Sequence, residues 1–228
     1  MGAMTGEYRP TTGIAEVDRA IGGVISGDNL VWEIDSGVAG DHFISNFVEA
    51  CEEGGVPVVY VSFNRSPQTI ASKYAKLMTS GRFSLIDCFS SGKGNSDEVF
   101  LKFFDDPARD AVHAPVHIAD PADPARLEQA IVEVGIRGGQ SANYIFDSLT
   151  GMLDLWGDEN RVVRLFGHLC PRLYDLKLTL GEDICQSYFG MRSVSYTNGK
   201  IQINGHPVYQ RLILDQGFYP YFNDTAPT

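Results

Sequence analysis

The chain has 228 residues, of which 43% are hydrophobic and 21% are charged, and its formal net charge is −11. This composition is sufficient for a buried core, and the negative charge disfavours nucleic acid and anionic membranes as partners. No apolar run is long enough to span a bilayer, and the first residues lack the pattern of a signal peptide. Residues 1–10, beginning with MGAM, are interpreted as a tag or N-terminal extension, and residues 11–228 as a single domain.

Five short apolar runs predict β-strands, at residues 29–34, 57–63, 83–89, 115–120 and 143–149. The runs are nearly continuous rather than alternating, which is typical of parallel strands covered on both faces. Helical patterns separate them, at residues 42–53, 66–78, 123–139 and 159–176. The regular alternation of strand and helix predicts an α/β fold with a doubly wound, mainly parallel sheet.

The sequence pattern changes after residue 180. Asn198-Gly199 lies between alternating residues, which predicts a β-hairpin, and residues 209–216 predict a further strand. We expect these to be antiparallel strands added to the edge of the sheet. Pro171 is expected to kink or end the preceding helix near Cys170. The aromatic run 218–222 is interpreted as edge packing or, if exposed, as a docking patch.

The four cysteines are scattered and form no C-x-x-C pair; they are Cys51, Cys88, Cys170 and Cys185. We interpret them as buried thiols of a protein in the reducing cytoplasm rather than as metal or redox residues.

The segment DSGVAGDH, residues 35–42, joins the first predicted strand to the first long helix. A phosphate-binding loop is expected at such a junction, with the pattern G-x-x-x-x-G-K-[ST]. Asp35 replaces the first glycine, Gly40 is present, Asp41 replaces the lysine and His42 replaces the hydroxyl residue. Three of the four fixed positions therefore differ, so the spacing by itself is a weak indication.

Asp41 stands where the loop lysine would neutralise a phosphate. A carboxylate about 5 Å from a phosphate charge costs roughly 3 kcal/mol per unit charge at an effective dielectric constant near 20. The dipole of the following helix favours an anion there by only about 0.3–1 kcal/mol. We therefore interpret Asp41 as a helix cap that occupies the place of a phosphate.

Three segments that follow one another along the chain strengthen the interpretation of residues 35–42 as a phosphate-loop position. The first is TTGIAEVDRAIGGVISGDNLVWEIDSGVAGDHF, the second GGVPVVYVSFNRSPQTI, and the third YIFDSLTGMLDLWGDENRVVRLF. Together they resemble the KaiC-like branch of the RecA superfamily of ATPases, over residues 11 to about 177. The resemblance implies a RecA-like three-layer fold with its core at residues 11–177 and a divergent β-rich part at residues 178–228.

The resemblance also implies which residues stand at the ATPase positions. Asp35, Gly37, Gly40, Asp41 and His42 correspond to the phosphate loop. Asn64 and Arg65 correspond to the two glutamates that activate water, and Asp147 and Ser148 to the Walker B strand end. Neither an amide nor a guanidinium can act as a general base near neutral pH. The resemblance therefore implies a degenerate member with no catalytic residues, for which ATP and magnesium binding is disfavoured and no cofactor is predicted.

Several residues have more than one interpretation. Asp147 is either a retained strand-end carboxylate or, with Asp41 and His42, a divalent metal ligand, although no ligand spacing supports a metal. Arg65 is either a surface residue or the partner of Asp41 or Asp147 across the pocket. Lys93 is interpreted as a loop lysine, because SGKG lacks the spacing of a phosphate loop.

One consequence of the resemblance concerns partners. The chain departs from the KaiC-like pattern after residue 177, where that family contacts the nucleotide of the neighbouring subunit. A dimer or hetero-assembly is therefore expected in preference to a hexamer.

Three functions follow from the sequence. The first is a pseudo-ATPase that acts in regulation, signalling or assembly through protein contacts. The second is a sensory domain that binds a small molecule at the vacated nucleotide site. The third is an atypical nucleotide enzyme whose basic groups come from Arg65, Lys93 or a partner subunit.

Overall fold

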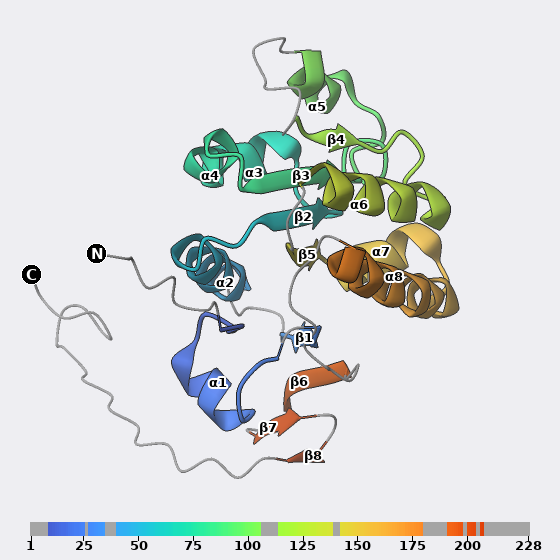
Figure 1. Cartoon of the computed structure of the whole chain (residues 1–228). Helices are drawn as coiled ribbons and strands as arrows, with labels where there is room; N and C mark the ends of the chain where they lie inside the picture. Colours follow the sequence, from blue (N-terminus) through green and yellow to red (C-terminus); the bar gives the residue numbers. More distant parts are fainter. Residues whose placement is uncertain are drawn as a thin grey trace, which may run out of the picture. The chain divides into compact units, whose positions relative to one another are not determined.

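The computed structural model describes residues 9–25, 27–34, 40–105, 114–138, 142–179, 191–197, 200–203 and 206–207. Its elements, in chain order, are α1 (Ala15–Ala20), β1 (Asn29–Glu33), α2 (Asp41–Glu53), β2 (Val58–Ser62), α3 (Pro67–Lys73), α4 (Ala75–Thr79), β3 (Phe83–Asp87), α5 (Glu98–Leu101), η1 (Lys102–Asp105), β4 (Val116–His117), α6 (Pro124–Gly138), β5 (Asn143–Asp147), α7 (Leu149–Trp156), α8 (Glu159–Thr179), β6 (Met191–Thr197), β7 (Lys200–Ile203) and β8 (His206–Pro207) (Figure 1). They form two compact units, one with α1 and the elements from α2 to α8, the other with β1 and β6 to β8.

The first unit contains a parallel sheet with the strand order β4-β3-β2-β5. Strand β2 lies in the middle, and its last residue, Ser62, is in register with Asp87 of β3 and with Asp147 of β5. The three strands therefore end in one row, which places the residues that follow them at the same edge. Ligands of open α/β sheets bind at this edge.

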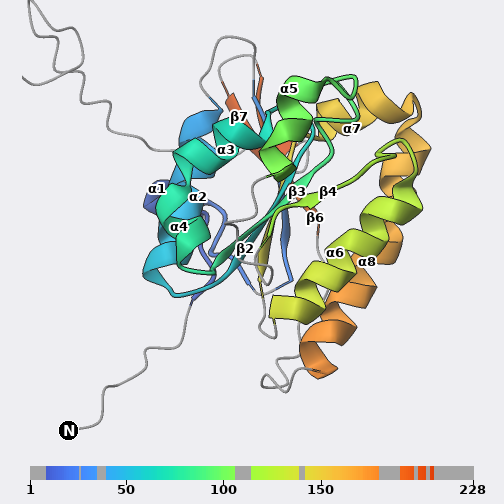
Figure 2. The same cartoon turned by 90° about the horizontal axis from the view of Figure 1, so that it is seen from above.

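Helices cover both faces of this sheet (Figure 2). Successive side chains of a strand point to opposite faces, and all five residues of β2 are buried. Tyr60 packs in a core with α2, α3 and α4, whereas Val59 and Val61 pack in a core with α6, α7 and α8. Full burial of such side chains contributes about 1.5–3 kcal/mol each, which explains the continuous apolar pattern of the strand.

Some helix boundaries follow local signals and others do not; the helix predicted at residues 66–78, for example, is divided into α3 and α4. Ser66 caps α3 by accepting a hydrogen bond from the Thr69 N–H, and Pro67 is the first helical residue, as the sequence predicts. Pro171 is expected to kink or end the last helix near Cys170; the end is wrong, because α8 continues through Pro171 to Thr179. A proline removes one helical hydrogen bond, and the packing of α8 along α6 and α7 offsets that loss.

The second unit is a four-stranded sheet with the order β1-β6-β7-β8. Strands β6 and β7 are antiparallel, with Thr197 opposite Lys200, which confirms a hairpin around the predicted position. β8 is also antiparallel to β7, but β6 runs parallel to β1, which the hairpin signal could not indicate. The predicted strand at 209–216 and the aromatic run at 218–222 lie outside the described residues.

The architecture is thus mixed α/β with a helix-covered parallel sheet, as predicted. A single domain over residues 11–228 stays a prediction. Cys51 and Cys88 are buried and Cys170 is half-buried, while Cys185 lies outside the described residues. Among the helices that the structure describes, none combines the length and apolar character needed to cross a membrane.

Candidate functional site

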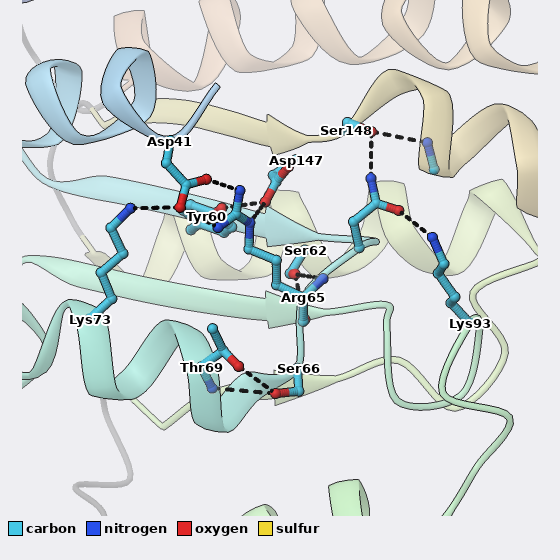
Figure 3. Close-up of polar contacts among 12 residues, drawn as sticks. Asp41, Tyr60, Ser62, Arg65, Ser66, Thr69, Lys73, Lys93, Asp147 and Ser148 are labelled. Carbon is cyan, nitrogen blue, oxygen red and sulfur yellow. Dashed lines mark hydrogen bonds and ion pairs between the residues drawn. The ribbon is translucent and has the colours of Figure 1, made fainter. Parts of the chain in front are cut away.

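Arg65 lies between two carboxylates at the carboxyl edge of the parallel sheet (Figure 3). Its Nε donates a hydrogen bond to Asp147 Oδ2 at 2.7 Å. Its Nη1 donates to Asp41 Oδ2 at 2.9 Å, and its Nη2 donates to Asp41 Oδ1. The guanidinium thus makes a bidentate ion pair with one carboxylate and a third charged hydrogen bond with another, an arrangement that suits its planar fork of donors.

The turn after β2 positions Arg65. The Ser62 hydroxyl donates to the Arg65 carbonyl oxygen at 2.7 Å, and the Arg65 N–H lies 3.3 Å from Ser62 Oγ. Ser62 is fully buried, so its hydroxyl is shielded from water. Three residues after the strand end, the chain is therefore fixed in the direction that aims the Arg65 guanidinium back across the edge of the sheet.

Asp41 is the first residue of α2, and Gly40 is its N-cap. The expectation that Asp41 itself caps the helix is therefore wrong, because its carboxylate instead binds Arg65 and lies 3.5 Å from Lys73 Nζ. The hydrogen bonds from Arg65 are the largest influence on this carboxyl group. Together with the charges of Arg65 and Lys73 they outweigh its partial burial and lower the pKa of Asp41 to about 2.

Asp147 ends β5 and is only 8% exposed. The Tyr60 hydroxyl donates to Asp147 Oδ2 at 2.6 Å, so one carboxylate oxygen accepts from both Tyr60 and Arg65. Burial, followed by the nearby Asp147 charge, raises the pKa of Tyr60 far above its usual range. The hydrogen bond to Asp41 is the main reason that the pKa of Arg65 is raised. Tyr60 is consequently a hydrogen-bond donor and Arg65 a permanent cation.

A second polar chain lies beside this cluster. Asn64 Nδ2 donates to Ser148 Oγ at 2.7 Å, and Ser148 caps α7 by accepting from the Gly151 N–H at 3.1 Å. Lys93 Nζ lies 3.4 Å from Asn64 Oδ1. The peptide bond between Asp147 and Ser148 is cis. Asn64 therefore connects the β2 edge to the first turn of α7 and to the loop that carries Lys93.

A cavity of about 220 Å³ adjoins Asn64 at the same edge of the sheet. Its lining is formed by Phe63, Asn64, Cys88, Gly92, Lys93, Gly151, Asp154 and Leu155. The walls are mainly apolar, and Lys93 and Asp154 supply opposite charges. Burial is the main cause that raises the pKa of Cys88 far above the usual range, so this thiol is a neutral part of the wall.

The structure brings together some of the predicted residues and not others. Of the two interpretations of Arg65, it supports the ion pair, with both Asp41 and Asp147. His42 is exposed, and its side chain forms no hydrogen bond or ion pair with another described residue. Within the described ranges, no group of three His, Cys, Asp or Glu residues is arranged to hold a metal. Asp35 and Gly37 lie outside the described residues.

Sequence reasoning missed Tyr60 and Lys73. Tyr60 did carry a signal, since a tyrosine inside a buried strand requires a hydrogen-bond partner for its hydroxyl. Lys73 carried none, because it is an ordinary helix lysine whose contact with Asp41 depends on how α3 packs beside α2. Such a long-range placement has no local pattern.

Comparisons with known proteins support the fold. No protein family matches the sequence, and no curated protein matches it. Among solved structures, a KaiC-like protein from the hyperthermophilic archaeon Pyrococcus horikoshii OT3 is similar, with a TM-score of 0.50 and 13% sequence identity. The match covers 86% of this chain and 85% of that one. At this identity the likeness shows a RecA-like fold and no more.

Proposed function

We propose that this chain is a RecA-like domain that does not hydrolyse ATP and that acts as a regulatory, signalling or assembly module through protein contacts. The observation that carries the proposal is the position of Arg65, which bridges Asp41 and Asp147. These are the positions that the KaiC-like resemblance assigns to the phosphate-binding lysine and to the Walker B carboxylate. An internal cation thus joins the two groups between which a magnesium triphosphate would be expected.

The charges in this cluster do not suit a triphosphate or its metal. Asp41 would repel the phosphates, and its low pKa keeps it ionised at all physiological pH values. Arg65 Nε lies 2.7 Å from Asp147 Oδ2. A magnesium ion bound to this oxygen would therefore be repelled by the guanidinium charge. Recruiting Arg65 to a phosphate would require it to leave both carboxylates, one of which is buried, and that exchange is costly.

The neighbouring polar groups also lack the chemistry of hydrolysis. Asn64 has no basic atom, and its amide is already engaged with Ser148. Arg65 cannot accept a proton. The residues at the two glutamate positions therefore hold structure instead of activating water, which supports a role without turnover.

Calorimetric titration of the purified protein with ATP and magnesium tests the proposal. We expect no binding in the micromolar range and no phosphate release above that of an Asp147→Ala variant. Arg65→Met serves as a comparison, since it removes the internal cation and keeps a side chain of similar length. Micromolar binding, or hydrolysis that Asp147→Ala abolishes, would refute the proposal and favour an atypical nucleotide enzyme.

The assembly part of the proposal has its own measurement. Because the C-terminal part departs from the KaiC-like pattern, we expect a dimer or a hetero-assembly. Light scattering coupled to gel filtration measures the mass of the particle directly. A hexamer would contradict this part of the proposal and leave the ATP titration unaffected.

The cavity next to Asn64 favours a second candidate, a sensory domain for a small molecule. Its mainly apolar wall with Lys93 on one side and Asp154 on another suits a compact ligand that carries both an anionic and a cationic group. A thermal-shift screen with amino acids and related zwitterions tests it. We expect stabilisation that Lys93→Ala removes. An unchanged midpoint with every compound would count against this candidate.

A further inference from the structure

Three polar side chains contact one another at the carboxyl ends of β3 and β4, away from the Arg65 cluster. Asp87 ends β3, His117 ends β4, and these two residues are register partners in the parallel ladder. His117 Nδ1 lies 3.1 Å from Asp87 Oδ2, and His117 Nε2 lies 3.0 Å from Ser91 Oγ. Ser91 belongs to the turn that follows β3. The two strand ends and this turn therefore place a hydroxyl, an imidazole and a carboxylate in series.

The surroundings of Asp87 determine the direction of these hydrogen bonds. Asp87 is fully buried, and its Oδ1 accepts from the N–H groups of Phe89 at 3.0 Å and Ser90 at 3.1 Å. A carboxylate oxygen only accepts, so His117 Nδ1 carries the hydrogen that points to Oδ2. Neutral His117 then presents an unprotonated Nε2 to Ser91. This tautomer allows the imidazole to take the Ser91 proton.

The positions of the two reactive groups are held on other sides as well. The Phe104 ring packs against the His117 imidazole, with ring centroids 5.1 Å apart. The Ser96 hydroxyl lies 3.3 Å from Ser91 Oγ and is exposed. Ser91 itself is partly exposed, whereas Asp87 is not. The accessible end of the series is therefore the nucleophilic end, as a reaction with an external molecule requires.

From this geometry we propose that Ser91 is a nucleophile for small carboxylic esters, with His117 as its general base and Asp87 as the positioning residue. Ser91 Oγ forms a bond with the ester carbonyl carbon while its proton passes to His117 Nε2. The bond from that carbon to the alkoxy oxygen breaks, and the leaving oxygen takes the proton from His117 as an alcohol. Water, deprotonated by His117, then attacks the acyl-serine, which releases the carboxylic acid and restores the Ser91 hydroxyl.

The adjacent backbone sets an expectation for the rate. No backbone hydrogen bond from the Ser91 N–H is found among the described residues, which leaves this group available as a donor. The N–H of Gly92 is already bonded to the carbonyl oxygens of Cys88 and Phe89, at 3.1 Å each. With one backbone donor in place of two, acylation is expected to be slow compared with that of dedicated esterases.

Gly92 and Lys93, the two residues after Ser91, line the cavity of about 220 Å³, whereas Ser91 and His117 are not part of its lining. On this proposal a short acyl group on Ser91 extends toward the mainly apolar cavity, which favours small esters as substrates. The proposal shares no residue with the cluster of Asp41, Arg65 and Asp147, so it stands whether or not the chain binds ATP.

Covalent labelling with an alkyl fluorophosphonate tests the proposal. The probe transfers its phosphonyl group to an activated serine with loss of fluoride, and intact-mass measurement followed by peptide mapping locates it. We expect one label for each chain, on Ser91. Ser91→Ala and His117→Gln are expected to lower the labelling rate about a hundredfold or more. Hydrolysis of 4-nitrophenyl acetate is expected to fall in parallel.

Ser90→Ala is the matched control, because Ser90 is the preceding residue and its buried Oγ forms no hydrogen bond within the part of the chain that the structure describes. It should label like the unmodified protein. Retained labelling in Ser91→Ala, or a label mapped to another residue, would overturn the proposal, as would absence of labelling. Peptide mapping needs only the unmodified protein, so the result stands even if a variant fails to fold.

Discussion

Arg65 and Asp147 are 82 positions apart in the chain, yet Arg65 Nε lies 2.7 Å from Asp147 Oδ2. The contact exists because β2 and β5 are parallel neighbours in register, so the residues after one strand meet the last residue of the other. Asp147 is nearly buried, and Arg65 is its cationic partner. The stability of this edge of the sheet therefore depends on the pair.

Removing the guanidinium should destabilise the fold. Arg65→Met leaves the nearly buried carboxylate of Asp147 without its cation, which costs about 2–4 kcal/mol. Arg65→Lys keeps a charge but not the planar fork, so its stability should lie between those of the unmodified protein and of Arg65→Met. Urea unfolding followed by circular dichroism measures the free energies. Arg82→Met is a control for a general loss of positive charge, and equal effects at both positions would contradict the role of the pair.

The low pKa of Asp41 predicts a pH dependence of stability. The folded state lowers this pKa from 3.8 to about 2, so the unfolded state binds the proton more readily. The contribution is fully present above about pH 4 and is lost as the pH falls towards 2. Asp41 is 47% exposed in its side chain, so solvent screening limits the effect to about 1 kcal/mol or less.

Unfolding free energies of the unmodified protein and of Asp41→Asn at pH 5 and pH 2.5 test this dependence. The difference between the two proteins should be larger at pH 5 and should shrink at pH 2.5. A difference that stays constant over this interval would show that the carboxylate does not titrate with a lowered pKa.

Two tyrosines in one core offer a matched pair of substitutions. Their rings are 6.1 Å apart, but only the Tyr60 hydroxyl has a partner, Asp147, whereas the buried Tyr74 hydroxyl has none within the described ranges. Tyr60→Phe should destabilise the fold by about 1.5–3 kcal/mol, because the lost hydrogen bond is to a charged group. Tyr74→Phe should be close to neutral or stabilising, which thermal unfolding can compare directly. Equal effects would refute the difference.

Gly151 allows α7 to approach the end of β2. A Cβ atom at this position would lie 2.8 Å from Asn64 Oδ1 and 2.8 Å from Phe63 Cβ, closer than real contacts allow. Gly151→Ala should therefore destabilise the protein by about 1–3 kcal/mol through overpacking. Gly167→Ala, in open space on α8, should instead stabilise it by up to about 1 kcal/mol. Denaturant midpoints of the two variants should shift in opposite directions.

The features that sequence reasoning predicted correctly are those written in local patterns. Continuous apolar runs indicated the parallel strands, Ser66 and Pro67 indicated a helix start, and Asn198-Gly199 indicated the hairpin. Pro171 does not end α8, because tertiary packing holds the helix together across it, and no local pattern reports that packing.

The residues of the site were predictable from the sequence, whereas the contacts of Arg65 were only one of two alternatives. Asp41, Arg65 and Asp147 were each singled out by position. Whether the arginine faced water or the carboxylates depended on side-chain direction, which the closed turn at Ser62 sets. The Asp87–His117–Ser91 series was beyond the sequence as well, because it requires β3 and β4 to be neighbours.

Ser62 lies between the arginine cluster and the serine turn and contacts both. It is in register with Asp147 on one side and Asp87 on the other, its hydroxyl donates to the Arg65 carbonyl, and its own carbonyl accepts from the Cys88 N–H at 3.0 Å. A binding event that displaces the end of this strand would change the geometry of the arginine cluster and of the serine turn together.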